Sequence, residues 1–292
     1  MKKKNFILCL LTAIIWGFAF TAQRVGGDLL GNFSYNAIRY FLGAFSLLPV
    51  ILIFEKKKPE MALKPTFLYG AAAGTVLFIA SALQQAGVII TQSAGKSGFI
   101  TGLYIILVPI IGLFLGKRIQ PTLFIAAPLS LLGLFLVSWS NEGGFTWGDA
   151  LLLIGAVFWA LHILVIDAAG DKVYSLRFSC LQFVVCAFLN LIFMLLFESI
   201  TLEAVRASVI PLLYGGIMSS GVAYTLQVLG QKDADPAIAS LVLSTETVFS
   251  AVGGALILHE TMSLRAYVGC VLIFTAIILC QLSPRHLKRK HS

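Results

Sequence analysis

The sequence has few charged residues for its length. Only 12% of its 292 residues are Asp, Glu, Lys or Arg, whereas 59% are hydrophobic and the mean hydropathy is +0.94. A soluble domain of this size carries about twice that charged fraction. The composition therefore excludes an ordinary soluble protein and indicates an integral membrane protein that crosses the bilayer several times.

The chain also lacks the motifs of metal, nucleotide and nucleophilic chemistry. Its 5 cysteines all fall inside apolar runs without metal-ligand spacing, and its 4 histidines form no motif pair. It has no Walker A pattern, so we do not expect ATP to drive it directly. It has no serine–histidine–acid set with a supporting motif. We therefore expect no cofactor, no metal and no enzyme activity.

The net charge of +8 could indicate a nucleic-acid partner, but the basic residues are not arranged as a binding surface. They form short clusters between apolar runs, at Lys2–Lys4, Lys56–Lys58, Lys117–Arg118 and Arg285–Lys290. Such clusters are typical of the cytoplasmic loops of membrane proteins. We expect membrane lipid and a small solute as partners, and no nucleic acid; the sequence makes no prediction of oligomeric state.

Apolar runs of about 20 residues are long enough to cross a bilayer as helices. The sequence contains ten such runs, separated by short connections, at 5–25, 33–54, 66–90, 94–116, 119–139, 147–167, 174–197, 207–230, 236–258 and 263–282. We therefore predict an all-α integral membrane fold with ten transmembrane helices.

The distribution of basic residues predicts the orientation of these helices. Of the 21 lysines and arginines, Arg39 lies within a run, and only Arg24, Lys96, Arg206 and Arg265 fall on one side of the membrane. All the others fall on the side of the amino terminus. Because lysine and arginine accumulate in cytoplasmic loops, both termini should be cytoplasmic. The expected location is the inner, or plasma, membrane of a bacterium.

The chain repeats itself with a shift of 143 residues, the separation of Trp16 and Trp159. The same shift aligns Gln84 with Gln227, and it aligns further pairs in two other segments. We therefore divide the chain into a five-helix repeat at 1–142, a second at 143–285 and a basic cytoplasmic tail at 286–292. An odd number of helices per repeat inserts the second copy upside down, which is the geometry of many alternating-access transporters.

Polar and aromatic residues at membrane depth need a partner or a function, because polar groups are costly in hydrocarbon. Helical spacing places several of them on one face of their runs, and equivalent faces in the two repeats would enclose a common central cavity. The candidate solute-binding residues are Trp16, Gln84, Thr101, Tyr104, Trp159, His162, Tyr224 and Gln227. Alternatively, the tryptophans lie in an interfacial belt, the glutamines bond helix to helix, and His162 is a packing residue.

Two charged residues within the runs are candidates for coupling transport to an ion. Glu246 is near the middle of its run, where a carboxyl group must be protonated, hydrogen-bonded or paired with a cation. Its alternative role is that of a neutral acid that bonds a neighbouring helix. Arg39 lies only a few residues inside its run, so it could also extend its charge to the membrane interface.

The repeated tryptophan and the segment from Ser240 to Glu260 resemble the EamA family of the drug/metabolite transporter superfamily, and the resemblance covers nearly the whole chain. In that family a Glu-Pro pair opens this segment and a Gly-Glu pair closes it. Here Glu246-Thr247 and His259-Glu260 stand at those places, and Lys117 occupies the closing position in the first repeat. The resemblance implies a helix bundle with a central cavity and the export of amino acids or related metabolites.

Three classes of function compete for this sequence. A secondary carrier that exports a small metabolite by alternating access agrees best with the repeat and the missing nucleotide motif. An intramembrane enzyme would need a nucleophile with a base, or a metal cluster, at membrane depth. A channel or small-molecule-sensing membrane protein would show conductance, or binding without flux.

Overall fold

The computed structural model describes residues 1–55, 63–117, 119–138, 145–259 and 263–282. In these residues the chain is helical and contains no strand. The predicted tail at 286–292, the basic cluster at 56–58, and Glu260 lie outside the described residues. The first half contains α1 (Lys3–Leu30), α2 (Asn32–Phe54), α3 (Leu63–Thr91), α4 (Ala94–Gly102), α5 (Tyr104–Phe114) and α6 (Leu123–Ser138). The second half contains α7 (Trp147–Ala169), η1 (Gly170–Lys172), α8 (Ser175–Phe197), α9 (Leu202–Ala207), α10 (Val209–Leu213), η2 (Tyr214–Tyr224), α11 (Thr225–Gln231), α12 (Pro236–Leu243), α13 (Glu246–Ile257) and α14 (Leu264–Leu282).

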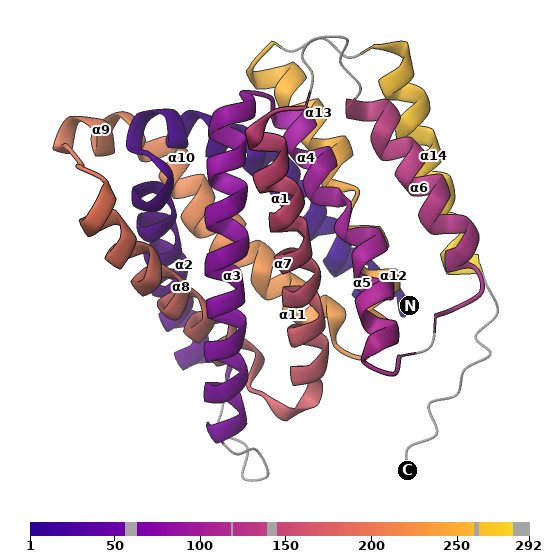
Figure 1. The fold of residues 1–292 in the computed structure, drawn as a ribbon. Helices are drawn as coiled ribbons and strands as arrows, with labels where there is room; N and C mark the ends of the chain where they lie inside the picture. The colour runs from indigo at the N-terminus through magenta and orange to yellow at the C-terminus, as the bar shows by residue number, and fades with distance from the viewer. Residues whose placement is uncertain (56–62, 118, 139–144, 260–262, 283–292) are drawn as a thin grey trace.

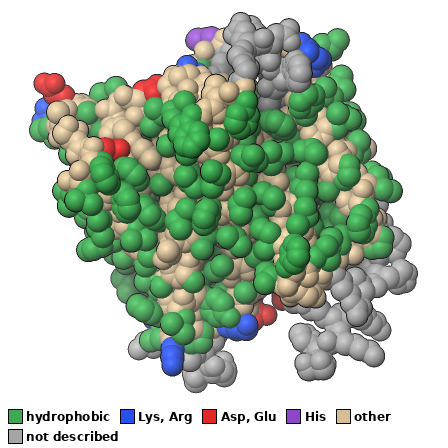
Figure 2. All heavy atoms as spheres, viewed as in Figure 1, with side chains coloured by type: hydrophobic (Ala, Val, Ile, Leu, Met, Phe, Trp, Pro, Cys, Tyr) green, Lys and Arg blue, Asp and Glu red, His purple; other side chains and the backbone are tan. Residues whose placement is uncertain are grey.

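Eight helical segments are long and apolar enough to cross a membrane. Two of the ten predicted spans correspond to shorter apolar helices, within α6 and α14. Hydrophobic side chains cover the middle of the face in Figure 2, whereas the charged side chains visible there lie at its upper and lower rims. Leu52 and Phe114 expose 85% and 87% of their surface. Such exposure is costly in water but is expected where a side chain contacts lipid.

Antiparallel helix pairs build the bundle. The helices α2 and α8 lie together, α3 packs on α7, and α6 and α14 form a pair at one edge (Figure 1). Small residues permit these close approaches, as expected for helices in lipid. A Cβ at Gly74 would lie 2.6 Å from the Gln182 carbonyl oxygen of α8, and one at Gly133 would lie 2.7 Å from the Gly269 carbonyl oxygen of α14.

Two of the spans are broken near the middle of the bundle. The span of α4 and α5 is interrupted at Leu103, and the span of α12 and α13 at Ser244 and Thr245. The shift of 143 residues places these interruptions at nearly equivalent positions. In the counterpart of α3, the stretch η2 is π-helical from Tyr214 to Tyr224. Such π-helical stretches often occur at functional sites, and this one contacts α1 and α2.

The carboxylates of Glu55 and Glu198 fix the two ends of the α2–α8 pair. Glu55, after α2, accepts hydrogen bonds from the backbone N–H groups of Leu176 (2.9 Å) and Arg177 (3.0 Å) at the start of α8. Glu198, after α8, accepts them from Phe33 (2.9 Å) and Ser34 (2.7 Å) at the start of α2. Each carboxylate therefore supplies the acceptor that the first N–H groups of a helix lack.

Candidate functional site

A cavity with an empty volume of about 420 Å³ lies between the two halves of the bundle. Helices α1, α2, α3, α4 and α5 line it from the first half, and α7, η2, α11 and α13 from the second. Its walls are formed by Trp16, Phe20, Gln23, Arg39, Gln84, Thr101, Tyr104, Trp159, Ile163, Ser219, Tyr224, Gln227 and Glu246.

An aromatic cluster forms one wall of this cavity. The rings of Trp16 and Trp159 are 6.3 Å apart between centroids, and both side chains are buried inside the bundle. Tyr224 packs against both, with centroid separations of 4.7 Å from Trp16 and 6.2 Å from Trp159. Its hydroxyl lies 3.3 Å from that of Tyr40. The two tryptophans that the shift of 143 residues relates, one from α1 and one from α7, thus meet inside the bundle.

Hydrogen-bonding atoms of this cavity wall differ in whether they have a protein partner. The Trp16 indole N–H donates to the Ser219 carbonyl oxygen of η2, at 3.3 Å. By contrast, within the described part of the chain, no partner is present for the Trp159 indole N–H, the Thr101 hydroxyl or the Gln227 carbonyl oxygen. Because buried polar atoms are usually hydrogen-bonded, these atoms are suited to bind a polar group of a ligand.

Arg39 is buried in the cavity wall and does not reach the membrane interface, since only 2% of its surface is exposed. Its Nε donates to the Asn36 side-chain oxygen at 2.9 Å, and an Nη donates to the Tyr40 hydroxyl at 3.1 Å. Its guanidinium carbon lies 4.5 Å from the ring centroid of Tyr40 and 5.5 Å from that of Tyr35. These contacts fix the direction of the guanidinium group.

Glu246 is the first residue of α13, at the break in its span, and its side chain is 4% exposed. Tyr104, the first residue of α5 after the corresponding break, lines the same cavity. The two breaks thus bring an acid and a phenol to the cavity from different halves. Gln84 and Gln227 also line the cavity, one from each half.

His162 lies behind the cavity wall and does not line it. Its Nε2 is 2.9 Å from the Gln182 side-chain oxygen of α8. Its ring packs edge-on against Trp159 and Tyr224, with centroids 5.9 Å from each. This geometry supports the packing interpretation, in which His162 positions the aromatic cluster.

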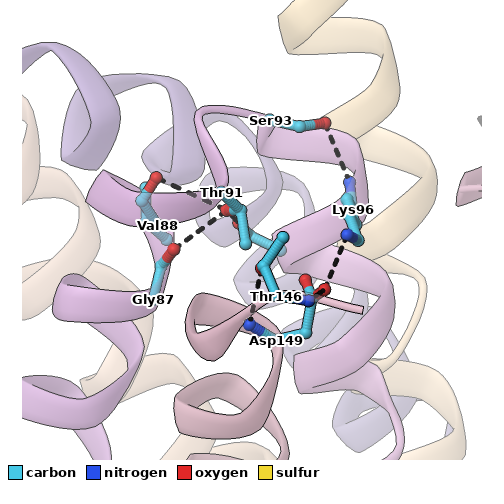
Figure 3. Close-up of polar contacts among 8 residues, drawn as sticks. Gly87, Val88, Thr91, Ser93, Lys96, Thr146 and Asp149 are labelled. Atoms are coloured by element: carbon cyan, nitrogen blue, oxygen red, sulfur yellow. Dashed lines mark hydrogen bonds and ion pairs between the residues drawn. The ribbon is translucent and has the colours of Figure 1, made fainter. Parts of the chain in front are cut away.

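Two ion pairs join α7 to the broken span of α4 and α5, one near each end of α7. At one end the Lys96 ammonium group lies 2.7 Å from the Asp149 carboxylate, whose side chain is 1% exposed (Figure 3). The same carboxylate accepts the Thr146 backbone N–H at 2.7 Å, as part of a capping box at the start of α7. At the other end Lys117 pairs with Asp167. These contacts lie above and below the cavity residues of the same helices.

The model of the EamA-like transporter family matches the chain twice, over residues 3–139 and 146–281. The chain belongs to the EamA-like transporter family. It is therefore a multi-pass membrane protein of a transporter family, as the sequence resemblance implied.

Relatives of this EamA-like chain are named as transporters. An uncharacterized transporter of Archaeoglobus fulgidus is 26% identical over 93% of this chain and 84% of its own length. The uncharacterized transporter YoaV of Bacillus subtilis is 22% identical over 91% of this chain and 92% of its own length. A solved crystal structure superposes with a TM-score of 0.79 at 17% identity, over 97% of this chain and 98% of that one. This last similarity concerns the fold alone.

Some residues of the cavity wall were not among the predicted site residues. Phe20 and Ile163 supply further apolar surface, and Ser219 supplies the carbonyl group for Trp16. Gln23 lies seven residues after Trp16, and helical spacing places both on the same face of α1. No pattern in the sequence indicated Ser219, because its carbonyl group is presented by the π-helical stretch.

Proposed function

We propose that this EamA-like protein is a secondary transporter that exports small metabolites such as amino acids. Two five-helix halves, at residues 1–142 and 143–285, would expose the central cavity alternately to each side of the membrane. The observation that carries this proposal is the position of Trp16 and Trp159. These equivalent residues of the two halves meet at 6.3 Å on the wall of one buried cavity.

The inverted arrangement of the halves is supported by two further observations. The family model matches the two halves separately. The Glu55 and Glu198 caps are also related by the shift of 143 residues, as are the helix starts that they bind. Two copies of one unit, inserted in opposite directions, would produce such reciprocal contacts.

The walls of the cavity support a small organic solute with an apolar part and a polar head. Aromatic rings from α1, α7 and η2 would cover the apolar part. Polar atoms without a protein partner among the described residues, such as the Trp159 N–H, would bind the polar head.

The proposed setting is the inner membrane of a bacterium, with both termini in the cytoplasm. The excess of lysine and arginine on the side of the amino terminus supports this orientation. Glu246 is the candidate for coupling export to the movement of protons or cations, because it is an acid on the cavity wall at membrane depth.

Solute flux in proteoliposomes tests this proposal directly. Vesicles containing the purified full-length protein would be loaded with labelled amino acids, and the released compounds would be identified by mass spectrometry. We expect release of chemically unchanged solute, which empty vesicles do not show. Chemical conversion of the solute would instead support an intramembrane enzyme, binding without flux would support a sensor, and ionic conductance would support a channel.

A further inference from the structure

Arg39 carries a buried positive charge that the described chain does not neutralise. Its side chain is among the largest that are fully enclosed. The ion pairs in the described part of the chain join other residues, and none includes Arg39. A buried cation without a counter-ion is costly in a membrane protein, so its presence on a cavity wall calls for an anion.

The groups that hold Arg39 are neutral and leave part of the guanidinium available. The Asn36 oxygen and the Tyr40 hydroxyl accept one hydrogen bond each, from Nε and from one Nη. A guanidinium group has five N–H donors in a planar fork, so further donors remain for a ligand. The neighbouring Tyr35 and Tyr40 rings fix its position through cation–π contacts without removing the charge.

The repeat indicates that helix packing alone does not require an arginine at this place. The position equivalent to Arg39 in the second half is Gln182 of α8, which is neutral and bonded to His162. Both residues are fully buried, and they lie on the paired helices α2 and α8. The positive charge is therefore a feature of one half only, and on that half it borders the cavity.

We infer that Arg39 binds a carboxylate group of the transported solute. This inference rests on the proposed transport function and specifies the class of solute. The planar guanidinium fork matches a carboxylate, and the bond between them would be charge-assisted. The Trp159 indole N–H, on the same cavity wall, is a second donor for that group.

The experiment uses full-length protein in proteoliposomes loaded with a ¹³C-labelled extract of bacterial metabolites. Mass spectrometry of the released compounds classifies every transported solute by its charged groups. We expect the solutes released by the wild type to carry a carboxylate, and Arg39→Gln to slow their release about tenfold or more, equivalent to a loss of ~1.4 kcal/mol. Arg39→Lys should retain part of the rate, because it keeps the charge but loses the planar fork.

Asn36→Asp provides a nearly isosteric second test that does not remove the arginine. The introduced carboxylate would lie beside the Arg39 Nε and compete with the solute for the positive charge. We expect the concentration for half-maximal transport of the carboxylate solutes to rise about tenfold, with the protein still folded. A concentration for half-maximal transport that stays within about twofold of wild type would overturn the inference.

The outcomes separate the inference from the proposed function. Release of uncharged, cationic or phosphate-bearing solutes without a carboxylate would overturn the carboxylate site while upholding transport. Undiminished release of carboxylates by Arg39→Gln would likewise overturn the carboxylate site while upholding transport. If the wild type released no labelled solute, the transport function itself would be contradicted, and the carboxylate site with it.

Discussion

Glu55 and Glu198 cap the two ends of one antiparallel helix pair: Glu55, at the end of α2, binds the start of α8, and Glu198, at the end of α8, binds the start of α2. The first accepts the N–H groups of Leu176 and Arg177, and the second accepts those of Phe33 and Ser34. Both the carboxylates and their donors are separated by 143 residues. The arrangement holds α2 and α8 in register, and α2 carries Arg39 of the cavity wall.

Removing either carboxylate charge should destabilise the protein. Hydrogen bonds to a charged group are worth about 1–3 kcal/mol, so Glu55→Gln and Glu198→Gln should each lower the midpoint of thermal unfolding by several degrees, about 2–8 °C. Because the two sites lie at opposite ends of the pair, the effects in the double variant should add. The measurement is thermal unfolding of the purified protein in detergent.

Glu203→Gln is the matched control, because Glu203 is an exposed acid in the first turn of the short helix α9. It should leave the unfolding midpoint unchanged. Equal stability of Glu198→Gln and the control would show that these caps do not hold the helix pair together.

The ion pair between Lys96 and Asp149, whose carboxylate is buried, should contribute more to stability than an exposed pair. Lys96→Met leaves a carboxylate that is 1% exposed without its cation, a change that costs about 3 kcal/mol when such pairs are broken. Lys2→Met removes a pair with Asp233 whose side chains are 67% and 42% exposed, and such pairs contribute about 0–1 kcal/mol. The comparison of their thermal unfolding midpoints tests this; similar midpoints for the two variants would contradict it.

Trp159→Ala and Gln84→Ala should abolish transport without reducing the amount of folded protein. Both side chains line the cavity, and Trp159 loses its contacts with Trp16 and Tyr224. The matched control is Trp147→Ala, since Trp147 is 69% exposed at the start of the same helix α7. Flux in proteoliposomes should fall about tenfold or more for the cavity variants only. If the cavity variants reduce expression and not flux per molecule, these residues have a packing role.

Glu246→Gln should remove the dependence of transport on pH if this acid carries the coupled proton. The amide keeps the size of the side chain on the cavity wall but cannot bind and release a proton. The measurement is initial flux in proteoliposomes across a range of pH, with Glu203→Gln as the control for an acid outside the cavity. A pH profile identical to that of the wild type would assign Glu246 a structural role.

The membrane class, eight of the ten apolar spans and the family could be predicted from the sequence, because they depend on composition and on a repeated pattern. Trp16 and Trp159 stood out because tryptophan is rare in the interior of a span and occurs here twice at one spacing. The breaks within two of the spans were harder to predict from the sequence. Gly102 stands directly before the break at Leu103, but a glycine at that place is equally compatible with close helix packing. Ser244 and Thr245 are neither proline nor glycine, so no local signal indicated the break that presents Glu246.

Other features depend on tertiary contacts that a single helix does not reveal. The position of Arg39, near the start of α2, is compatible with an arginine that reaches the interface or with one that is enclosed. The tyrosines at 35 and 40 and the neighbouring η2 decide that Arg39 is enclosed. Glu55 and Glu198 follow the ends of apolar runs, where acids are common, and their function appears only when α2 and α8 are placed side by side.

Access to the cavity from the two sides of the membrane tests the central claim most directly. A single cysteine at Thr101, a cavity residue whose hydroxyl has no partner within the described chain, would be introduced after replacing the native cysteines. A membrane-impermeant maleimide would then be added to right-side-out or to inside-out vesicles. Alternating access predicts that this cysteine is labelled from either side, whereas labelling from one side only would contradict it.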